Sequence, residues 1–198
     1  MDDSVLHAIN GFLFRHDPVE DGVLLYSSAS QALFLLLVLG LVLLAWGPHA
    51  AAIRRAGVAA GATAAVALLV TQLVSRAVDR ARPFVADPTG VHLFDHHAPD
   101  ASFPSDHATA AFAIAVAICL RSPRWGVPVL LAALLLGVSR VGLGVHYPSD
   151  VLGGAFVGAL SAMVLWLPPV GPRLDRLADR IGDVLRRVGL AIRLRSPA

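Results

Sequence analysis

Five long apolar stretches constrain the fold of this 198-residue chain more than any other feature. They cover approximately residues 22–46, 56–74, 105–120, 125–138 and 151–167. The first two meet the requirement of roughly 20 residues for crossing a bilayer as an α-helix, and the last three are shorter. Hydrophobic residues make up 56% of the chain and charged residues only 15%, well below the ~25% charged residues of soluble proteins. The sequence therefore predicts an all-α fold, a polytopic membrane helical bundle with about five transmembrane helices.

The three shorter stretches reach less far than the bilayer core is thick. At about 1.5 Å per residue, a helix of about 16 residues extends about 24 Å, against about 30 Å of hydrocarbon. If these helices share one cytoplasmic level, we expect their other ends to lie somewhat below the opposite lipid surface. A lipid head group could then be reached there without lifting its tail into water.

Amphipathic segments flank the apolar stretches at both ends of the chain. Near the amino terminus, apolar side chains share one helical face, and this segment is too short to span, which predicts an interfacial helix. The residues of this face are Val5, Leu6, Ile9, Phe12 and Leu13. After a proline- and glycine-rich break at 168–172, apolar residues recur at helical spacing among arginines, which predicts a basic amphipathic helix on the membrane surface. A solvated tail helix is the alternative. We therefore predict a membrane-embedded domain over 1–170 and a basic tail over 171–198.

The distribution of arginines predicts the orientation, because cytoplasmic loops carry an excess of positive charge. All 16 basic residues are arginine. With five spans, the side of the carboxy-terminal tail carries Arg54, Arg55, Arg121, Arg124, Arg173, Arg176, Arg180, Arg186, Arg187, Arg193 and Arg195. The other side carries only Arg15, Arg76, Arg80, Arg82 and Arg140. We therefore expect a cytoplasmic carboxy terminus, with the opposite end of the bundle facing outward.

Four short polar clusters lie where apolar stretches begin or end. They are the segments 80–83, 104–107 and 139–140, and the pair His146 and Asp150. In the predicted topology all four fall on the outer face, so we expect them to converge although they are far apart in sequence. Two histidines, several arginines and a carboxylate are the groups that phosphoryl transfer through a histidine would use.

The two histidines have different predicted roles. Pro148 and Ser149 indicate a helix start beside His146, with Asp150 in its first turn. Asp150 can then accept the proton on one ring nitrogen and leave the other nitrogen free to attack phosphorus. His107 follows Ser105, a plausible helix N-cap whose backbone N–H groups form an anion site, and it is suited to general acid–base work.

Arginines are the predicted phosphate ligands, because guanidinium groups bind phosphate oxygens bidentately. Arg82 and Arg140 are the best candidates, and Arg80 is weaker because arginines at span ends are often interface anchors. His92, His96 and His97 lie near two acidic residues, Asp95 and Asp100. Their spacing is not that of a regular metal site, so a solvated or substrate-rim loop is favoured and no metal is expected.

The three motif-bearing segments resemble the type 2 phosphatidic acid phosphatase superfamily, whose motifs read K-x6-R-P, P-S-G-H and S-R-x5-H-x3-D. The third motif is complete here, with Ser139, Arg140, His146 and Asp150 in register. The second has Asp106 in place of glycine. The first keeps Arg82 and Pro83 but has Ser75 where lysine is expected.

Further residues resemble the bacitracin-resistance branch of this superfamily: the run 101–109, Asn10-Gly11, and the small size of the chain. The resemblance implies that His146 forms a phosphohistidine, oriented by Asp150, and that His107 is its acid–base partner. It also implies that Arg82, Arg140, Ser105 and Ser139 hold the phosphate, with neither metal nor cofactor. We expect Arg76 or Arg80 to replace the missing cation of the first motif.

Members of that branch are undecaprenyl-diphosphate phosphatases. The resemblance therefore implies hydrolysis of a polyprenyl diphosphate to the monophosphate at the outer face of a bacterial plasma membrane, which recycles the cell-wall carrier lipid. The expected partners are this lipid and the surrounding membrane lipids, and no nucleic acid. Phosphatidate, phosphatidylglycerol phosphate or a polyprenyl-linked sugar phosphate is an alternative substrate. A lipid-binding or transport protein with a decayed site is a further alternative, whereas five apolar spans rule out the soluble haloperoxidases of the superfamily.

Overall fold

The computed structural model describes residues 2–195, with side chains described for residues 2–188. This part of the chain contains eight helices and no strand. The helices are α1 (Asp2–Phe14), α2 (Asp17–Leu43), α3 (Ala50–Val78), α4 (Pro83–Ala86), α5 (Asp106–Cys119), α6 (Pro123–Gly142), α7 (Pro148–Trp166) and α8 (Val170–Arg195). The predicted all-α fold is confirmed, including a helix at each end of the chain.

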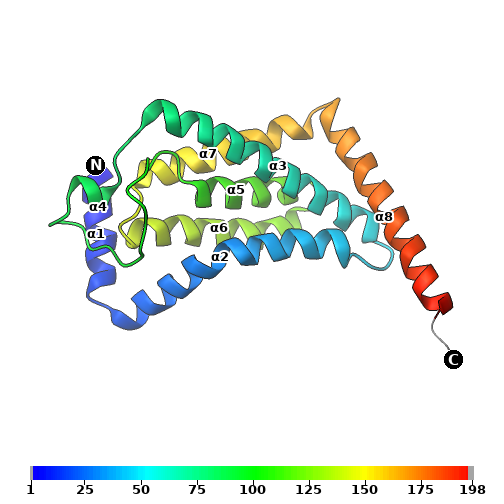
Figure 1. Cartoon of the computed structure of the whole chain (residues 1–198), viewed down its shortest axis with the longest axis horizontal. Helices are drawn as coiled ribbons and strands as arrows, with labels where there is room; N and C mark the ends of the chain where they lie inside the picture. Colours follow the sequence, from blue (N-terminus) through cyan, green and yellow to red (C-terminus); the bar gives the residue numbers. More distant parts are fainter. Residues whose placement is uncertain (1, 196–198) are drawn as a thin grey trace.

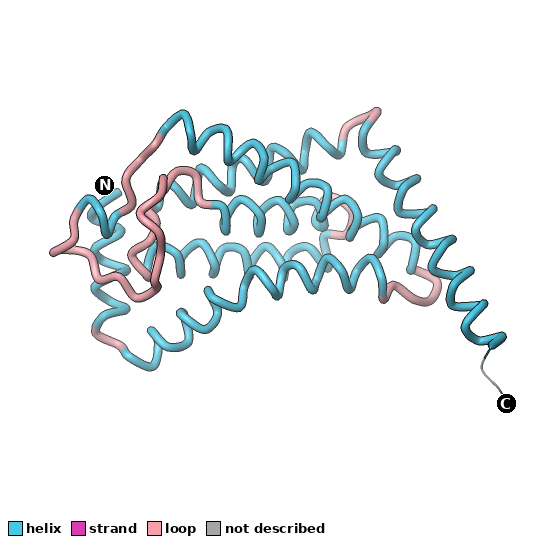
Figure 2. The backbone as a smooth tube through the Cα atoms, viewed as in Figure 1, coloured by secondary structure: helices cyan, strands magenta, loops and turns pink. Residues whose placement is uncertain are grey.

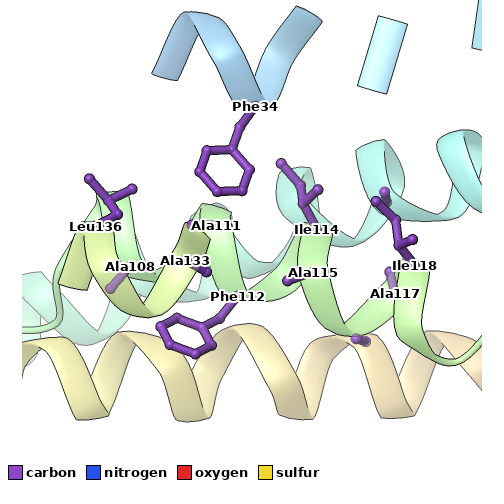
Figure 3. Close-up of a cluster of buried hydrophobic side chains, with 12 residues drawn as sticks. Phe34, Ala108, Ala111, Phe112, Ile114, Ala115, Ala117, Ile118, Ala133 and Leu136 are labelled. Carbon is purple, nitrogen blue, oxygen red and sulfur yellow. The ribbon is translucent and has the colours of Figure 1, made fainter. Parts of the chain in front are cut away.

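Five helices form a bundle with α5 at its centre. Figure 1 shows α2, α3, α5, α6 and α7 running along one axis, with α1 across one end and α8 slanting past the other. Helix α5 packs against α3, α6 and α7. Its side of the core is rich in alanine, and Figure 3 shows Phe34 reaching from α2 toward it. Small side chains let the neighbouring backbones approach α5 closely.

Glycines on α7 allow two of these close approaches. A Cβ atom at Gly158 would lie 2.5 Å from the carbonyl oxygen of Thr109, and one at Gly154 would lie 2.6 Å from that of Ser105. Both distances are far inside van der Waals contact, so only glycine fits without moving α5. This close packing places the start of α5 beside the first two turns of α7, where the polar clusters lie.

The outer surface of the bundle is apolar, as a membrane protein requires. Within the described residues, four helices are long and apolar enough to cross a membrane, namely α2, α3, α6 and α7, and α5 is a shorter apolar helix. Large apolar side chains on this surface, such as those of Leu25, Leu69 and Leu152, are 70%, 67% and 70% exposed. These helices correspond to the five predicted spans.

The predicted lengths of the last three spans are right only for α5. Helix α5 has 14 residues, or about 21 Å at the helical rise. Helices α6 and α7 have 20 and 19 residues, or about 30 and 28 Å, because they continue through polar residues that end the apolar stretches. Only the amino-terminal end of α5, which carries His107, is therefore recessed below the level of its neighbours.

Helix α8 is fixed to the bundle by ion pairs at the end away from α1. Arg55 donates two hydrogen bonds to Asp179, at 3.0 and 2.8 Å, and Arg121 donates one to Asp175 at 3.0 Å. These bonds join α8 to α3 and to the turn after α5. The predicted tail residues 196–198 lie outside the described residues.

Candidate active site

All four polar clusters meet at the end of the bundle crossed by α1. Helices α3 and α6 end there, and α5 and α7 begin there (Figure 1). Figure 2 shows the long loop between α4 and α5 folded over these helix ends. The convergence predicted from the topology is therefore present in the structure.

A cavity of about 240 Å³ lies beneath this loop and holds both predicted catalytic histidines. The polar residues that line it include Arg82, His97, Asp100, Asp106, His107 and His146. His107 and Asp106 come from the first turn of α5, whose N-cap is Ser105. The Ser105 hydroxyl oxygen accepts a 3.5 Å hydrogen bond from the backbone N–H of Ala108. The remaining N–H groups of this helix end favour an anion in the cavity.

The His146 ring is buried and held in a defined orientation. Its Nδ1 lies 2.9 Å from the carbonyl oxygen of Ser102. Because a carbonyl oxygen only accepts, Nδ1 carries the proton and Nε2 keeps its lone pair. Nε2 lies 3.2 Å from an Nη1 donor of Arg82. The nitrogen with the free electron pair is thus beside a guanidinium group that can bind phosphate.

Asp150 supports His146 less directly than the sequence predicts. Its Oδ2 lies 3.6 Å from His146 Nδ1, an ion-pair distance, and the shorter hydrogen bond of that nitrogen goes to Ser102. The fully buried carboxylate is occupied elsewhere: it accepts from the backbone N–H of Tyr147 at 2.8 Å and from Arg80 at 2.8 Å. The carboxylate therefore acts on the ring mainly as a nearby negative charge.

Arg80 and Arg76 do not reach the cavity. Arg80 binds Asp150 with Nη1 and Asp2 of α1 with Nη2 at 2.9 Å, and its guanidinium lies 3.8 Å from the ring centroid of Tyr147. Arg76 is exposed near the end of α3 and does not line the cavity. The predicted phosphate contacts of these two arginines have no support in their positions.

Arg82 and Arg140 are both almost fully buried beside the site. Arg82 donates to Asp100 at 2.8 Å and to the carbonyl of Val145 at 3.0 Å. Arg140 donates from Nη1 to Ser27 at 3.0 Å and to Asp95 at 3.5 Å. Its Nε and Nη2 are buried and have no hydrogen-bond partner among the described residues. Arg140 does not line the cavity, but unpaired buried donors are costly, so its free donors favour a phosphate oxygen that reaches them from the cavity.

Ser139 lies away from the cavity although it precedes Arg140. Its hydroxyl group donates to the carbonyl of Leu136 at 2.7 Å within α6. It lines a separate groove formed with α1 and α2. The predicted contact of Ser139 with phosphate has no support in this position, since successive residues on a helix point in different directions.

Burial sets the charge state of the two histidines in the loops of the site. It lowers the pKa of His146 to about 4, the nearby cations Arg82 and Arg140 act in the same direction, and Asp150 opposes them. Burial also lowers the pKa of His97, with a further contribution from the same two arginines. Both rings are therefore neutral at pH 7, the state that a nucleophilic imidazole requires.

The sequence favoured a solvated or substrate-rim loop here, but it did not identify which loop residues contact the site, and it missed two glutamines. His97 lines the cavity, with its ring centroid 6.4 Å from that of His146, and Asp95 and Asp100 pair with the two buried arginines. The density of histidines and carboxylates in this loop was the available signal. Gln31 and Gln72 also line the cavity, and their signal was a polar residue inside an apolar span. Among the described residues, no group of three or more potential ligands could hold a metal ion.

A bundle of apolar helices that ends in a pocket of histidines and arginines defines a membrane protein with a phosphate site. Residues 56–170 match the PAP2 superfamily. The chain belongs to this superfamily, and the predicted membership is confirmed.

Two curated relatives and one solved structure show the extent of the similarity. Undecaprenyl-diphosphatase BcrC of Bacillus subtilis is 36% identical over 161 residues, which cover 81% of this chain and 80% of that protein. Putative undecaprenyl-diphosphatase YbjG of Escherichia coli is 38% identical over 133 residues, 65% of each chain. LpxE of Aquifex aeolicus has the same fold, with a TM-score of 0.64 at 22% identity over 82% of this chain and 93% of that one.

Proposed function

We propose that this protein is a lipid phosphatase that removes the terminal phosphate from a polyprenyl diphosphate, of the undecaprenyl type, and so recycles the carrier lipid of the cell wall. The similarity to two undecaprenyl-diphosphatases supports this substrate. One structural observation carries the reaction: His107 and His146 line the same cavity, with Arg82 at the free nitrogen of His146. An apolar cavity that shares residues with this site can take the hydrocarbon chain.

The first step transfers the terminal phosphoryl group to His146. Nε2 attacks the terminal phosphorus, and the bond from that phosphorus to the bridging oxygen breaks. The electron pair leaves with the prenyl monophosphate, and His107, whose protonated form is favoured by the negative charge of the bound diphosphate, can donate a proton to the departing oxygen. Arg82 and Arg140 stabilise the charge on the phosphoryl oxygens, while Ser102 and Asp150 stabilise the imidazolium that forms.

The second step restores the enzyme. His107 now accepts a proton from water, whose oxygen attacks the phosphorus of the phosphohistidine. The N–P bond breaks, the electron pair returns to Nε2, and inorganic phosphate leaves. His146 is again neutral, and His107 is again protonated for the next cycle.

The site faces outward from a bacterial plasma membrane in this proposal. Eleven of the 16 arginines lie on the side of α8, and a positive excess marks the cytoplasmic side. The cavity lies at the opposite end of the bundle from α8 (Figure 1). This orientation would let the enzyme act on carrier lipid released at the outer surface.

Phosphate release by the purified protein tests the proposed function. Undecaprenyl diphosphate, phosphatidate and phosphatidylglycerol phosphate should be compared in the presence of a chelator, and we expect a clear preference for the diphosphate. His146→Ala should lose essentially all turnover. His96→Ala is the matched control, because His96 is an exposed histidine of the loop between α4 and α5 and does not line the cavity. A clear preference for phosphatidate, or full activity of His146→Ala, would contradict the proposal.

A further inference from the structure

A second cavity adjoins the catalytic cavity inside the membrane region. It has a volume of about 470 Å³ and lies between α2 and α3, against α5. Its walls are mostly apolar, with Phe34, Leu68 and Ile114 among them. The two cavities share four lining residues, namely Gln31, Gln72, Asp106 and His107. A ligand that fills both must therefore pass these side chains.

We call Gln31, Gln72 and Asp106 the polar collar. Gln31 lies on α2 and Gln72 on α3, and both are exposed on helices whose neighbouring exposed residues, such as Leu35 and Leu69, are apolar. A polar side chain within a membrane-spanning helix is costly unless it faces a cavity or a partner, and such residues commonly mark substrate paths. The collar is therefore poorly explained by packing alone.

The collar is organised by a hydrogen bond between two of its members. Nε2 of Gln72 donates to Oδ2 of Asp106 at 3.3 Å. An amide nitrogen has two N–H groups, so a second donor of Gln72 is available for a ligand. Asp106 thus fixes where that donor points. The contact also offsets part of the repulsion that a carboxylate exerts on a neighbouring phosphate.

The order of chemical groups along a polyprenyl diphosphate matches the order of the two cavities. With the terminal phosphate at His146 and the hydrocarbon between α2 and α3, the phosphate that stays on the lipid lies at the collar. With a prenyl monophosphate at His146, the ester oxygen and first carbons would lie there instead. The amide donors would then face hydrocarbon, which is unfavourable.

We propose that the polar collar binds the retained phosphate and selects diphosphates over monophosphates. Gln31 and Gln72 donate to this phosphate, and Asp106 is a positioning residue that acts through Gln72. This inference rests on the proposed function, because it assigns a site to one part of the proposed substrate. The collar would thus determine substrate specificity, whereas the nucleophile and the arginines act on the phosphate that is removed.

The test is the ratio of kcat/KM for farnesyl diphosphate to kcat/KM for farnesyl monophosphate. Gln31→Leu and Gln72→Leu keep the side-chain size and suit a lipid-facing helix. Each should lower the ratio roughly tenfold or more, the effect of losing one hydrogen bond to a charged group. Leu73→Met is the matched control on α3, since Leu73 is 67% exposed and lines neither cavity. It should leave the ratio unchanged.

Two substitutions of Asp106 separate positioning from a structural role. Asp106→Asn keeps an oxygen that can accept from Gln72, so the ratio should stay within about twofold of wild type. Asp106→Gly removes the acceptor, and the ratio should fall as far as in Gln72→Leu. The double variant Asp106→Gly with Gln72→Leu should fall no further than either single variant, because both act through one contact.

The measurements distinguish a failure of the collar proposal from a failure of the proposed function. If wild type hydrolyses the diphosphate and His146→Ala does not, but the glutamine variants keep the wild-type ratio, the collar proposal is wrong and the proposed function stands. A wild-type enzyme that does not discriminate between the two farnesyl substrates also overturns the collar. If wild type hydrolyses neither, the proposed function fails, and the collar fails with it.

Discussion

The carbonyl oxygen of Ser102 determines which nitrogen of His146 is available for chemistry. It lies 2.9 Å from Nδ1, so the proton is held there and the lone pair of Nε2 faces Arg82. A neutral imidazole next to two arginines is electrostatically favourable, because an imidazolium would be repelled by both. The same cations attract the phosphoryl group to the unprotonated nitrogen. In the proposed mechanism, burial and local charge thus prepare His146 as the nucleophile before substrate binds.

The buried environment of His146 should shift the pH dependence of kcat/KM. Since burial lowers the pKa of His146 to about 4, the free enzyme keeps a neutral nucleophile down to about pH 5. The acidic limb of kcat/KM that reports His146 should therefore lie near pH 4, below the ordinary histidine value of about 6.5. A kcat/KM profile with farnesyl diphosphate, corrected for the ionisation of the substrate, measures this limb. A corrected limb at pH 6.5 would show that the ring is not shielded as described.

At the scale of elements, helix α1 is linked to the carboxylate of Asp150 through the side chains of Asp2 and Arg80. Asp2 accepts from the backbone N–H of Ser149 at 3.0 Å and from Arg80 at 2.9 Å, and Arg80 donates to Asp150 at 2.8 Å. The start of α7 is thereby tied to α1 and to the end of α3. Because Asp2 is hydrogen-bonded, its pKa is lowered despite partial burial, which by itself would raise it. Helix α1 is thus part of the support of the site.

We predict that Asp2→Ala lowers kcat about tenfold and leaves KM within about twofold. The reason is that Arg80 loses one anchor and holds Asp150 less firmly, whereas the phosphate ligands are untouched. Arg80→Ala should lower kcat further, because Asp150 then loses its own buried partner. Steady-state kinetics with undecaprenyl diphosphate provide both constants.

Two exposed residues serve as controls for this prediction. Asp3→Ala removes the next acidic residue of α1, and Arg76→Ala removes an exposed arginine of α3 that does not line the cavity. Both should retain kcat within about twofold. A change in KM alone for Arg80→Ala would instead place Arg80 among the phosphate ligands, as the sequence predicts.

The helices were predictable from the sequence because apolar stretches of suitable length have few alternatives in a membrane. Their ends were less predictable: α6 and α7 continue through Arg140 and Pro148–Asp150, and polarity there reflects the site and not the end of the helix. The motif residues His107, His146, Arg82 and Arg140 do converge. The roles of Arg80 and Asp2 could not be predicted, since they depend on where α1 crosses the bundle, and no local pattern encodes that contact.

The whole molecule has a chemically distinct end on each side of the membrane region. One end carries the cavity beneath the long loop, and the other carries α8 with its arginines and the ion pairs to α3. Burial of Asp179 is slight, so the hydrogen bonds from Arg55 dominate and lower the pKa of this carboxyl group. The pair stays ionised at physiological pH, and α8 remains attached to the end that we place in the cytoplasm.

Cysteine labelling tests this orientation. In a Cys119→Ser background, Thr89→Cys places a single thiol in the exposed loop over the cavity, and Arg187→Cys places one on the exposed surface of α8. In intact cells a membrane-impermeant maleimide should label position 89 and not position 187. Both positions should react after the membrane is permeabilised, which is the control for accessibility. Labelling of position 187 alone in intact cells would show that the protein has the opposite orientation.

The most direct test of the central claim is to trap the phosphoenzyme. Diphosphate labelled with ³²P on its terminal phosphate should be mixed with His107→Ala enzyme and quenched in alkali, in which phosphohistidine is stable. A polyprenyl monophosphate is a good leaving group, so His107→Ala should still transfer the phosphoryl group and then fail to hydrolyse it. We predict label on the peptide that contains His146, and no label in the double variant His107→Ala with His146→Ala. Label on another residue, or full turnover by wild type with no labelled intermediate under rapid quench, would contradict the account.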